Sequence, residues 1–323
     1  MNTEPDFAAS HTIMSALRTN FSSVVIGQQQ TIDDVLVCVA AGGHILIEGV
    51  PGLAKTLLAR SLAQSAHAED VRIQFTPDLM PSDIVGHVMF EQDSNNFIVR
   101  QGPVFANIVI ADEVNRAPAK TQSALLEAMQ EQQVSIEGDT RALPDPFIVI
   151  ATQNPIEQEG TYPLPQAQLD RFLCKLLIDY PSAEDEVTML KLVTHEQVAN
   201  RFSLENLKPV ATLDDMKALQ LATSHVAVDD AVQRYIVDIV NATRNWNGID
   251  VGAGPRASIS LLRAARGHAM LEGQTFVTPD NVKTMGPAVL RHRIQLTPDL
   301  EIEGYKPDDV IANLLNDTDA PRQ

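Results

Sequence analysis

Short, unbroken runs of apolar residues alternate with longer segments of helical periodicity over roughly the first 180 residues. Runs that are apolar on both faces are typical of strands in a parallel sheet covered by helices on both sides. Between them, apolar residues recur at spacings of three and four, which predicts helices. The predicted buried strands cover residues 44–48, 71–75, 108–111, 147–151 and 175–178. The pattern therefore predicts an α/β domain with a five-stranded parallel sheet.

Two β-hairpins are predicted within this domain. One has its polar turn at Asp93, between short apolar runs at 89–91 and 97–99. The other turns at Gly138. Both turns contain residues that favour tight reversals of the chain.

The pattern changes after Pro181 and is helical to about residue 294, with no predicted strand. We expect a small domain of about four helices there. The predicted division is an α/β domain at residues 1–181 and a helical domain with a polar tail at residues 182–323.

Composition narrows the possible classes of protein. The chain has 323 residues, 24 Lys and Arg, 42 Asp and Glu, and a formal net charge of −18. Such an acidic chain repels phosphate backbones, so extensive binding of nucleic acid is disfavoured. Only two cysteines are present, Cys38 and Cys174, and we expect buried free thiols. The start of the chain does not resemble a signal peptide, and the longest apolar run, 35–41, is too short for a membrane span, so we expect a cytoplasmic protein.

The segment after the first predicted strand resembles a phosphate-binding loop. The pattern G-x-x-x-x-G-K-[ST] is matched at Gly49, Lys55 and Thr56, whereas Ala54 replaces the second glycine. In such a loop backbone N–H groups hold phosphate, the lysine faces the β/γ charge and the hydroxyl binds Mg²⁺. The alternative is a turn of small residues followed by a solvated lysine. The predicted phosphate-binding residues are Gly49, Val50, Pro51, Gly52, Leu53, Ala54, Lys55 and Thr56.

Two acids end the third predicted strand, at Asp112 and Glu113. Ligands of open α/β sheets bind beyond the carboxyl ends of the strands, where both acids are expected. Asp112 would hold the Mg²⁺ shell together with Thr56, and Glu113 would polarise the attacking water. The alternative is a pair of solvated charges at a strand end.

Three further polar residues are candidates, each with a plain structural alternative. Asn154 follows the fourth strand and could orient water against a γ-phosphate, or could cap the turn before Pro155. Arg171 precedes the fifth strand and could reach an anion, or could pair with Asp170. Arg256 follows Pro255 at a predicted helix start and could bind an anion, or could be solvated.

Taken together, these segments resemble the MoxR group of AAA+ ATPases, in the helix-2-insert branch, over residues 25–293. The resemblance implies a P-loop AAA+ domain followed by a helical lid domain. It identifies Asn154 as sensor 1, Arg171 as the arginine finger and Arg256 as sensor 2. It also places Ile26 and Gly27 near the adenine. Residues 78–86 and the hairpin at Asp93 would form the helix-2 insert.

The same resemblance implies a function and partners. Members of the group bind ATP and Mg²⁺ and assemble into rings, usually hexamers. They act as chaperone-like factors that mature partner proteins or insert metal cofactors, often with a protein that carries a von Willebrand factor A domain. We therefore expect an ATPase that remodels a client protein.

Two other functions are weighed against it. A nucleic-acid motor of the same branch is opposed by the negative charge and by hairpins with few cations, since the first has no Lys or Arg over residues 89–99. A scaffold that binds nucleotide without hydrolysis is opposed by the joint presence of Glu113, Asn154 and Arg171. Of the remaining residues, Trp246 is expected to pack in the helical domain, and the cluster from Arg291 to Arg293 around His292 is expected to be solvated.

Overall fold

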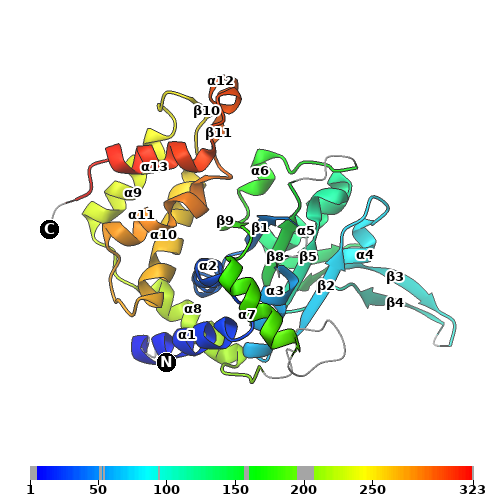
Figure 1. Cartoon of the computed structure of the whole chain (residues 1–323). Helices are drawn as coiled ribbons and strands as arrows, with labels where there is room; N and C mark the ends of the chain where they lie inside the picture. The colour runs from blue at the N-terminus through cyan, green and yellow to red at the C-terminus, as the bar shows by residue number, and fades with distance from the viewer. Residues whose placement is uncertain are drawn as a thin grey trace.

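Figure 1 shows the chain as a computed structural model with a sheet-containing part and a helical part side by side. The structure describes residues 6–50, 53, 55–93, 95–155, 160–194 and 207–321. Within these residues, no helix is both long enough and apolar enough to cross a lipid bilayer.

The central sheet has five parallel strands in the order β2-β5-β8-β1-β9 (Figure 1). Each strand coincides, within two residues at either end, with a run predicted to be a buried strand. The strands are β1 (Ile45–Gly49), β2 (Asp70–Gln74), β5 (Ile108–Asp112), β8 (Ile148–Gln153) and β9 (Cys174–Ile178). In the middle of the sheet, Ile45 of β1 is opposite Ile150 of β8 and Cys174 of β9. All five strands therefore end at the same edge, and the predicted fold class is confirmed.

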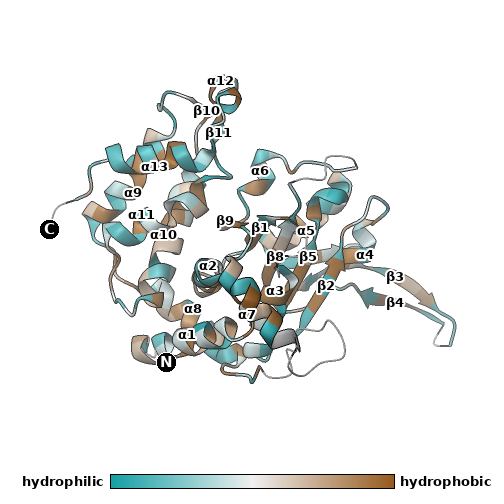
Figure 2. Cartoon of the chain, viewed as in Figure 1, coloured by the Kyte–Doolittle hydropathy of each residue, from teal (hydrophilic) through white to brown (hydrophobic). Residues whose placement is uncertain are grey.

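Alternate residues of the strands enter cores on opposite faces of the sheet. Ile45 and Ile47 belong to the larger core, whereas Leu46 belongs to the other. Figure 2 shows apolar residues concentrated along these strands. The larger core includes α1 (Phe7–Ser22), α2 (Gln29–Ala40) and α3 (Lys55–Ser65), and the smaller one includes α5 (Ala119–Glu131). Strands with both faces buried read as continuous apolar runs, as the sequence indicated.

Both predicted hairpins are present. The first consists of β3 (Gly86–Glu91) and β4 (Asn96–Gln101), follows α4 (Pro81–Val85), and projects from the body of the molecule (Figure 1). The second consists of β6 (Gln133–Ile136) and β7 (Asp139–Ala142). Its two-residue turn, Glu137-Gly138, has positive φ at both positions, as the right-handed twist of a hairpin favours.

The helical part is more elaborate than predicted. Its described helices are α7 (Ala183–Thr194), α8 (Leu213–Ser224), α9 (Asp230–Ala242), α10 (Pro255–Leu271), α11 (Pro279–Leu290), α12 (Pro298–Ile302) and α13 (Pro307–Asp317). The expectation of about four helices ending near residue 294 was wrong, because α13 buries Val310, Ile311 and Leu314 behind an acidic first turn. The absence of strands was also wrong, since β10 (Ile249–Val251) pairs with β11 (Gln295–Leu296). Strands of two or three residues are too short for a periodic signal.

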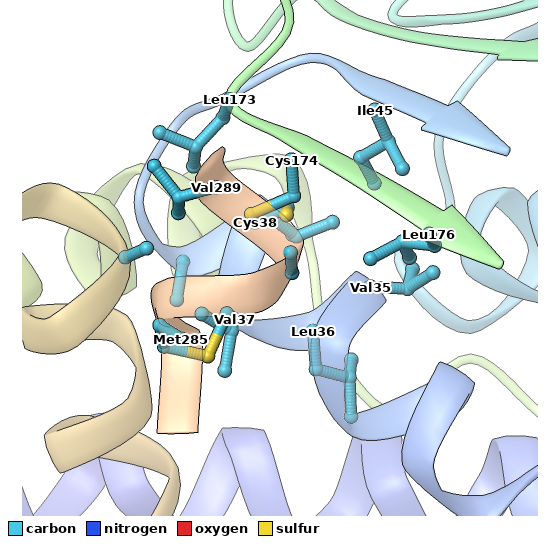
Figure 3. Packing of buried hydrophobic residues seen from close by; sticks show 14 of the residues in the cluster. Val35, Leu36, Val37, Cys38, Ile45, Leu173, Cys174, Leu176, Met285 and Val289 are labelled. Carbon is cyan, nitrogen blue, oxygen red and sulfur yellow. The ribbon is translucent and has the colours of Figure 1, made fainter. Parts of the chain in front are cut away.

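One hydrophobic core runs from the sheet into the helical part. In Figure 3, Val289 of α11 packs near Leu173, the residue before β9. Met285 of the same helix packs near Val37 of α2. The two cysteine side chains, from α2 and β9, lie in the same core as buried free thiols, which confirms their predicted state. This core contains residues from both sides of residue 181. The division into two domains at that residue therefore stays a prediction.

The basic segment after α11 is not solvated, which corrects the sequence prediction. His292 and Arg293 are 4% and 2% exposed. The Arg293 guanidinium pairs with Asp170, from the connection between α6 (Gln166–Leu169) and β9. A partner so distant in the sequence cannot be recognised from local pattern. Trp246 packs against the larger core, as predicted.

Candidate nucleotide site

Lys55 begins α3 and lies at the carboxyl edge of the sheet. Its ammonium donates hydrogen bonds to the carbonyl of Gly49, at the end of β1, and to the carbonyl of Gln153, at the end of β8 (3.4 Å). Burial lowers its pKa, and the nearby carboxylates of Asp112 and Glu113 oppose that effect. A partly desolvated cation at the start of a helix is well suited to bind an anion that replaces the two carbonyls.

The predicted phosphate loop is described only in part. Gly49, Val50, Leu53, Lys55 and Thr56 are described, and the lysine and threonine are the first two residues of α3. A side chain at the first glycine would collide with β9, because a Cβ there would lie 2.8 Å from the carbonyl oxygen of Ile178. The remaining predicted loop residues, Pro51, Gly52 and Ala54, lie outside the described residues.

Asp112 ends β5 and is 8% exposed. One carboxylate oxygen accepts a hydrogen bond from the Thr152 hydroxyl (2.5 Å), and the other accepts two from the Arg72 guanidinium (2.6 and 3.0 Å). Hydrogen bonds to both of its oxygens therefore fix the orientation of the Asp112 carboxylate at the carboxyl edge.

Glu113 has a left-handed backbone, with φ 55° and ψ 51°. Its N–H donates to the Thr152 hydroxyl (2.9 Å), so one threonine of β8 bridges both acids. Its carboxylate accepts hydrogen bonds from Gln74 and Arg116, each at 3.0 Å. A non-glycine residue in this region costs about 1–3 kcal/mol, and such costs concentrate at functional sites.

Asn154 follows β8 directly and is 5% exposed. It lines a cavity of about 340 Å³ together with Glu48 and Gln153, at the ends of β1 and β8. Asn154, Lys55, Asp112 and Glu113 therefore lie at the ends of neighbouring strands, where their order in the sheet brings them to one edge.

Ile26 and Gly27 line a separate pocket with Asp185 of α7. Gly27 has a φ of 74°, and a Cβ there would lie 2.7 Å from the Asp185 carboxylate. Only glycine therefore fits between the N-terminal segment and the first helix after residue 181. Asp185 is a residue that the sequence reasoning missed.

Arg171 and Arg256 lie at the opposite edge of the sheet. Both line a pocket of about 330 Å³ that includes Gly43 and His44, at the start of β1. Arg171 donates to the carbonyl of Leu126 in α5 (2.7 Å), while Asp170 pairs with Arg293 instead. At roughly 3.3 Å per residue, five-residue strands separate this edge from the Lys55 edge by about 15 Å. Apart from Ile26 and Gly27 in their separate pocket, the predicted site residues that the structure describes thus form two groups, one at each edge.

Sequence reasoning also missed Arg72, Gln74 and Thr152, which hold the two acids. Their only local signal was polarity: β2 alternates polar and apolar residues, and the polar threonine directly follows the apolar run of β8. That Gln74 is opposite Asp112 follows from the pairing of β2 with β5, which the sequence does not specify.

Comparisons with known proteins agree with this architecture. Residues 44–174 match the model of the ATPase family associated with various cellular activities (AAA), and residues 241–314 match that of the AAA lid domain. The uncharacterised protein YeaC of Bacillus subtilis is 42% identical, over 97% of this chain and 96% of its own length. The chaperone MoxR1 of Mycobacterium tuberculosis is also 42% identical, over 98% of this chain and 84% of its own length.

A solved structure has the same fold. It is the crystal structure of a candidate ATPase from Cytophaga hutchinsonii, with a TM-score of 0.88 and 39% identity, covering 97% of this chain and 96% of that one. Similarity of this extent spans the sheet, both hairpins and the helical part together. The chain therefore belongs to the MoxR family of AAA ATPases.

Proposed function

We propose that this protein hydrolyses ATP at the carboxyl edge of its sheet and uses the energy to remodel a client protein. The observation that carries the proposal is the division of the charged residues between two edges. Lys55, Asp112 and Glu113 occupy the carboxyl edge, whereas Arg171 and Arg256 line one pocket at the amino edge. One subunit thus supplies half of a catalytic site at each edge.

The residues at the carboxyl edge fit Mg²⁺ bound together with a nucleotide. The Asp112 carboxylate and the Thr56 hydroxyl are oxygen ligands, which Mg²⁺ prefers. Among the described residues, no group of three or more His, Cys, Asp and Glu side chains could hold a metal ion. Phosphate oxygens and water would therefore complete the shell, as is usual for Mg²⁺. When bound, the ion neutralises charge on the phosphate oxygens.

Arg72 would control access to this ion. Its guanidinium occupies one oxygen of Asp112 in the structure. Asp112 can then bind the ion through its other oxygen or through water, or Arg72 can move aside. Thr152 keeps the carboxylate oriented in either case, because it also holds the backbone of Glu113.

Glu113 would act as the base for the attacking water. Gln74 and Arg116 each donate to its carboxylate, so the side chain is held at the carboxyl edge. Asn154 would orient the same water from the end of β8. Lys55 would hold the phosphate in the ground state. Lys55 would therefore affect ATP binding, whereas Glu113 and Asn154 would affect turnover.

The arginines of the amino edge would act on the nucleotide of a neighbouring subunit. About 15 Å of sheet separates them from the Lys55 of their own chain, too far for direct contact with the same phosphate. A ring of subunits, which we propose to be a hexamer, brings the amino edge of one chain to the carboxyl edge of the next. Both Arg171 as the finger and Arg256 as sensor 2 would then work in trans.

The projecting hairpin supports a protein client over a nucleic acid. Phe90 and Phe97 are opposite each other across β3 and β4 with ring centroids 5.3 Å apart, and both are exposed. Glu91 and Asp93 stand beside them, and residues 89–99 contain no cation. Exposed aromatics among carboxylates suit an unfolded, partly basic polypeptide and repel phosphates.

The finer partner assignments rest on family membership. The relative named chaperone MoxR1 supports a chaperone-like role for this chain as well. We propose a client that is matured by remodelling, including by insertion of a metal cofactor, with a von Willebrand factor A domain protein as the adaptor. We also propose that the protein acts in the cytoplasm.

Two substitutions test the ATPase. Lys55→Ala should abolish ATP binding, because it removes the cation that faces the phosphates. Glu113→Gln should bind ATP normally and turn over roughly 30- to 1,000-fold more slowly, the equivalent of about 2–4 kcal/mol of transition-state stabilisation. Calorimetric titration with ATP and a phosphate-release assay measure the two effects. Near-normal turnover by Glu113→Gln would contradict the assigned role, and no turnover in the unchanged protein would favour the non-hydrolysing scaffold.

A further inference from the structure

Arg293 has a hydrogen-bond partner for every N–H of its guanidinium, although its side chain is only 1% exposed. Such complete satisfaction is required when a permanently charged group is buried. The partners are the Asp170 carboxylate (2.9 Å), the carbonyls of Leu173 (3.2 Å), Phe172 (2.6 Å) and Val289, and the Ser260 hydroxyl (3.1 Å).

Three of these partners surround Arg171 in the sequence. Asp170 precedes it, and Phe172 and Leu173 follow it, in the connection that leads into β9. The neighbouring His292 adds a further contact, between its Nε2 and the carbonyl of Phe172 (3.3 Å). Arg293 and His292 thus hold the backbone on both sides of Arg171.

The Ser260 contact extends the same network to Arg256. Ser260 lies in α10 four residues after Arg256, so the two share one face of the helix. Both residues line the amino-edge pocket, as does Arg171. Arg293 lies in the segment just after α11, a helix that packs against α10 and β9 (Figure 1). A single side chain therefore contacts the two elements that carry the two pocket arginines.

We propose that Arg293 is a positioning residue that holds Arg171 and Arg256 in one fixed arrangement toward the neighbouring subunit. The inference rests on the proposed action of these arginines in trans. Arg293 itself touches no nucleotide, and it sets the direction of two groups that do. The planar guanidinium group is essential to this role, because the ammonium of a lysine offers three donors from one atom and cannot reach five partners.

This role predicts a specific division of kinetic effects. The ATP site of the same chain lies at the other edge of the sheet, so ATP binding should stay within about twofold of normal when Arg293 is changed. Turnover should fall roughly 10- to 100-fold, since a displacement of about 1 Å in a catalytic group can cost 10²-fold. A general loss of structure would instead weaken binding as well.

Arg293→Lys is the primary variant, and Arg266→Lys is its matched control. Arg266 is also in α10 and partly buried, but within the described part of the chain it donates only to the carbonyl of Val226, between α8 and α9. The control should retain normal turnover. If Arg293→Lys does not fold, Ser260→Ala replaces it, because that change removes only the contact with α10. Ser260→Ala should slow turnover by about two- to fivefold at unchanged ATP affinity.

Mixed rings distinguish this inference from the proposed function. An Arg293→Lys subunit should keep a good site and lack a good finger. Mixing it with Glu113→Gln subunits, which have a dead site and intact arginines, should restore activity above the sum of the separate proteins. Mixing it with Arg171→Ala subunits should not restore activity, because neither kind of subunit supplies a correctly placed arginine finger.

A third mixture, of Glu113→Gln with Arg171→Ala, tests action in trans by itself. If it shows no gain after confirmed subunit exchange, action in trans fails and the role of Arg293 fails with it. If it gains and Arg293→Lys, or Ser260→Ala in its place, has normal turnover, only the role of Arg293 is overturned. Recovery in the mixture with Arg171→Ala would overturn it too.

Discussion

Asp34 is a carboxylate held at an energetic cost within α2. Desolvation by burial raises its pKa from 3.8 to about 6, against smaller opposing effects of a hydrogen bond from Gln30 (3.0 Å) and of the Arg291 charge. The repulsion from Asp33 adds to the rise. Because the folded pKa lies above the unfolded value, this carboxyl favours folding below about pH 4, and that contribution is lost as pH rises through about 6.

Asp34→Asn should therefore stabilise the protein at neutral pH. A shift of about two pKa units sets an upper limit of about 3 kcal/mol, and we expect a gain of roughly 1–2 kcal/mol above pH 7 that disappears below pH 4. Urea unfolding at several pH values measures the free energy of unfolding. Asp33→Asn is the control and should destabilise at neutral pH, since Asp33 pairs with Arg18 (2.7 Å). A gain from Asp34→Asn that does not depend on pH would contradict the assignment.

The acid pair of the candidate site depends on the backbone conformation of one residue and on the hydroxyl of another. Glu113 takes a left-handed backbone, and Thr152 supplies the hydroxyl that binds both the Asp112 carboxylate and the Glu113 N–H. The acid pair could be predicted from the strand that precedes it. The threonine that supports the pair could not, because it becomes a neighbour only when β8 pairs with β5.

At the scale of elements, the β3–β4 hairpin is the feature that most differs from the rest of the α/β part. Its strands pair with each other and with no strand of the central sheet, and its large apolar side chains are exposed toward the tip. An exposed aromatic pair contributes little to the core, which is why the proposed client surface is placed on this hairpin.

Replacing both aromatics should separate client binding from hydrolysis. The double change Phe90→Ser and Phe97→Ser should leave basal ATP turnover within about twofold, because the site is in other elements. In the Glu113→Gln background with ATP, binding of fluorescent casein should weaken roughly tenfold, about 1.4 kcal/mol, for the loss of two exposed aromatic contacts. Fluorescence anisotropy measures the binding.

The matched control is Ile302→Ser in α12, where another large apolar side chain is 85% exposed. It should leave casein binding unchanged. If the double variant binds casein as tightly as the protein with the unchanged hairpin, the hairpin is not part of the client-binding surface. Salt-sensitive, submicromolar binding of DNA at physiological salt would instead revive the nucleic-acid motor.

At the scale of the whole molecule, the proposed mechanism makes the isolated chain an incomplete catalyst, because the two groups of site residues lie at opposite edges of the sheet. Specific activity should therefore rise with protein concentration as subunits assemble. An arginine supplied in trans can be worth about 10³–10⁵ in rate, so Arg171→Ala should bind ATP normally and turn over slowly.

Mixing subunits provides the direct measurement. Glu113→Gln and Arg171→Ala subunits should together exceed the sum of their separate activities, because some interfaces join a good site to a good finger. Each mixture is compared with the two proteins assayed apart after subunit exchange has been verified. Simple additivity would show that Arg171 does not act across the interface.

Much of this organisation was already determined by the sequence alone. The five strands, the two hairpins, the loop that ends in Lys55 and the acids at Asp112 and Glu113 depend on local rules: apolar runs, turn residues and strand–loop–helix order. Such rules act over a few residues, so the linear pattern contains them. The assignment of roles to Ile26, Gly27, Asn154, Arg171 and Arg256 came from family resemblance, and it stays a prediction.

Only the tertiary structure decided which of these residues share a site. The strand order puts Arg72 and Gln74 beside the acids. The parallel strands separate Arg171, before β9, from Lys55, after β1, by the length of a strand. Local pattern was wrong for the segment from Arg291 to Arg293, which reads as solvated because three basic residues are costly to bury. Arg293 is buried nonetheless, since Asp170 and carbonyls from distant segments offset the lost hydration. These hydrogen-bond partners come from segments distant in the sequence, so they offset the cost of burying Arg293 only once the chain has folded.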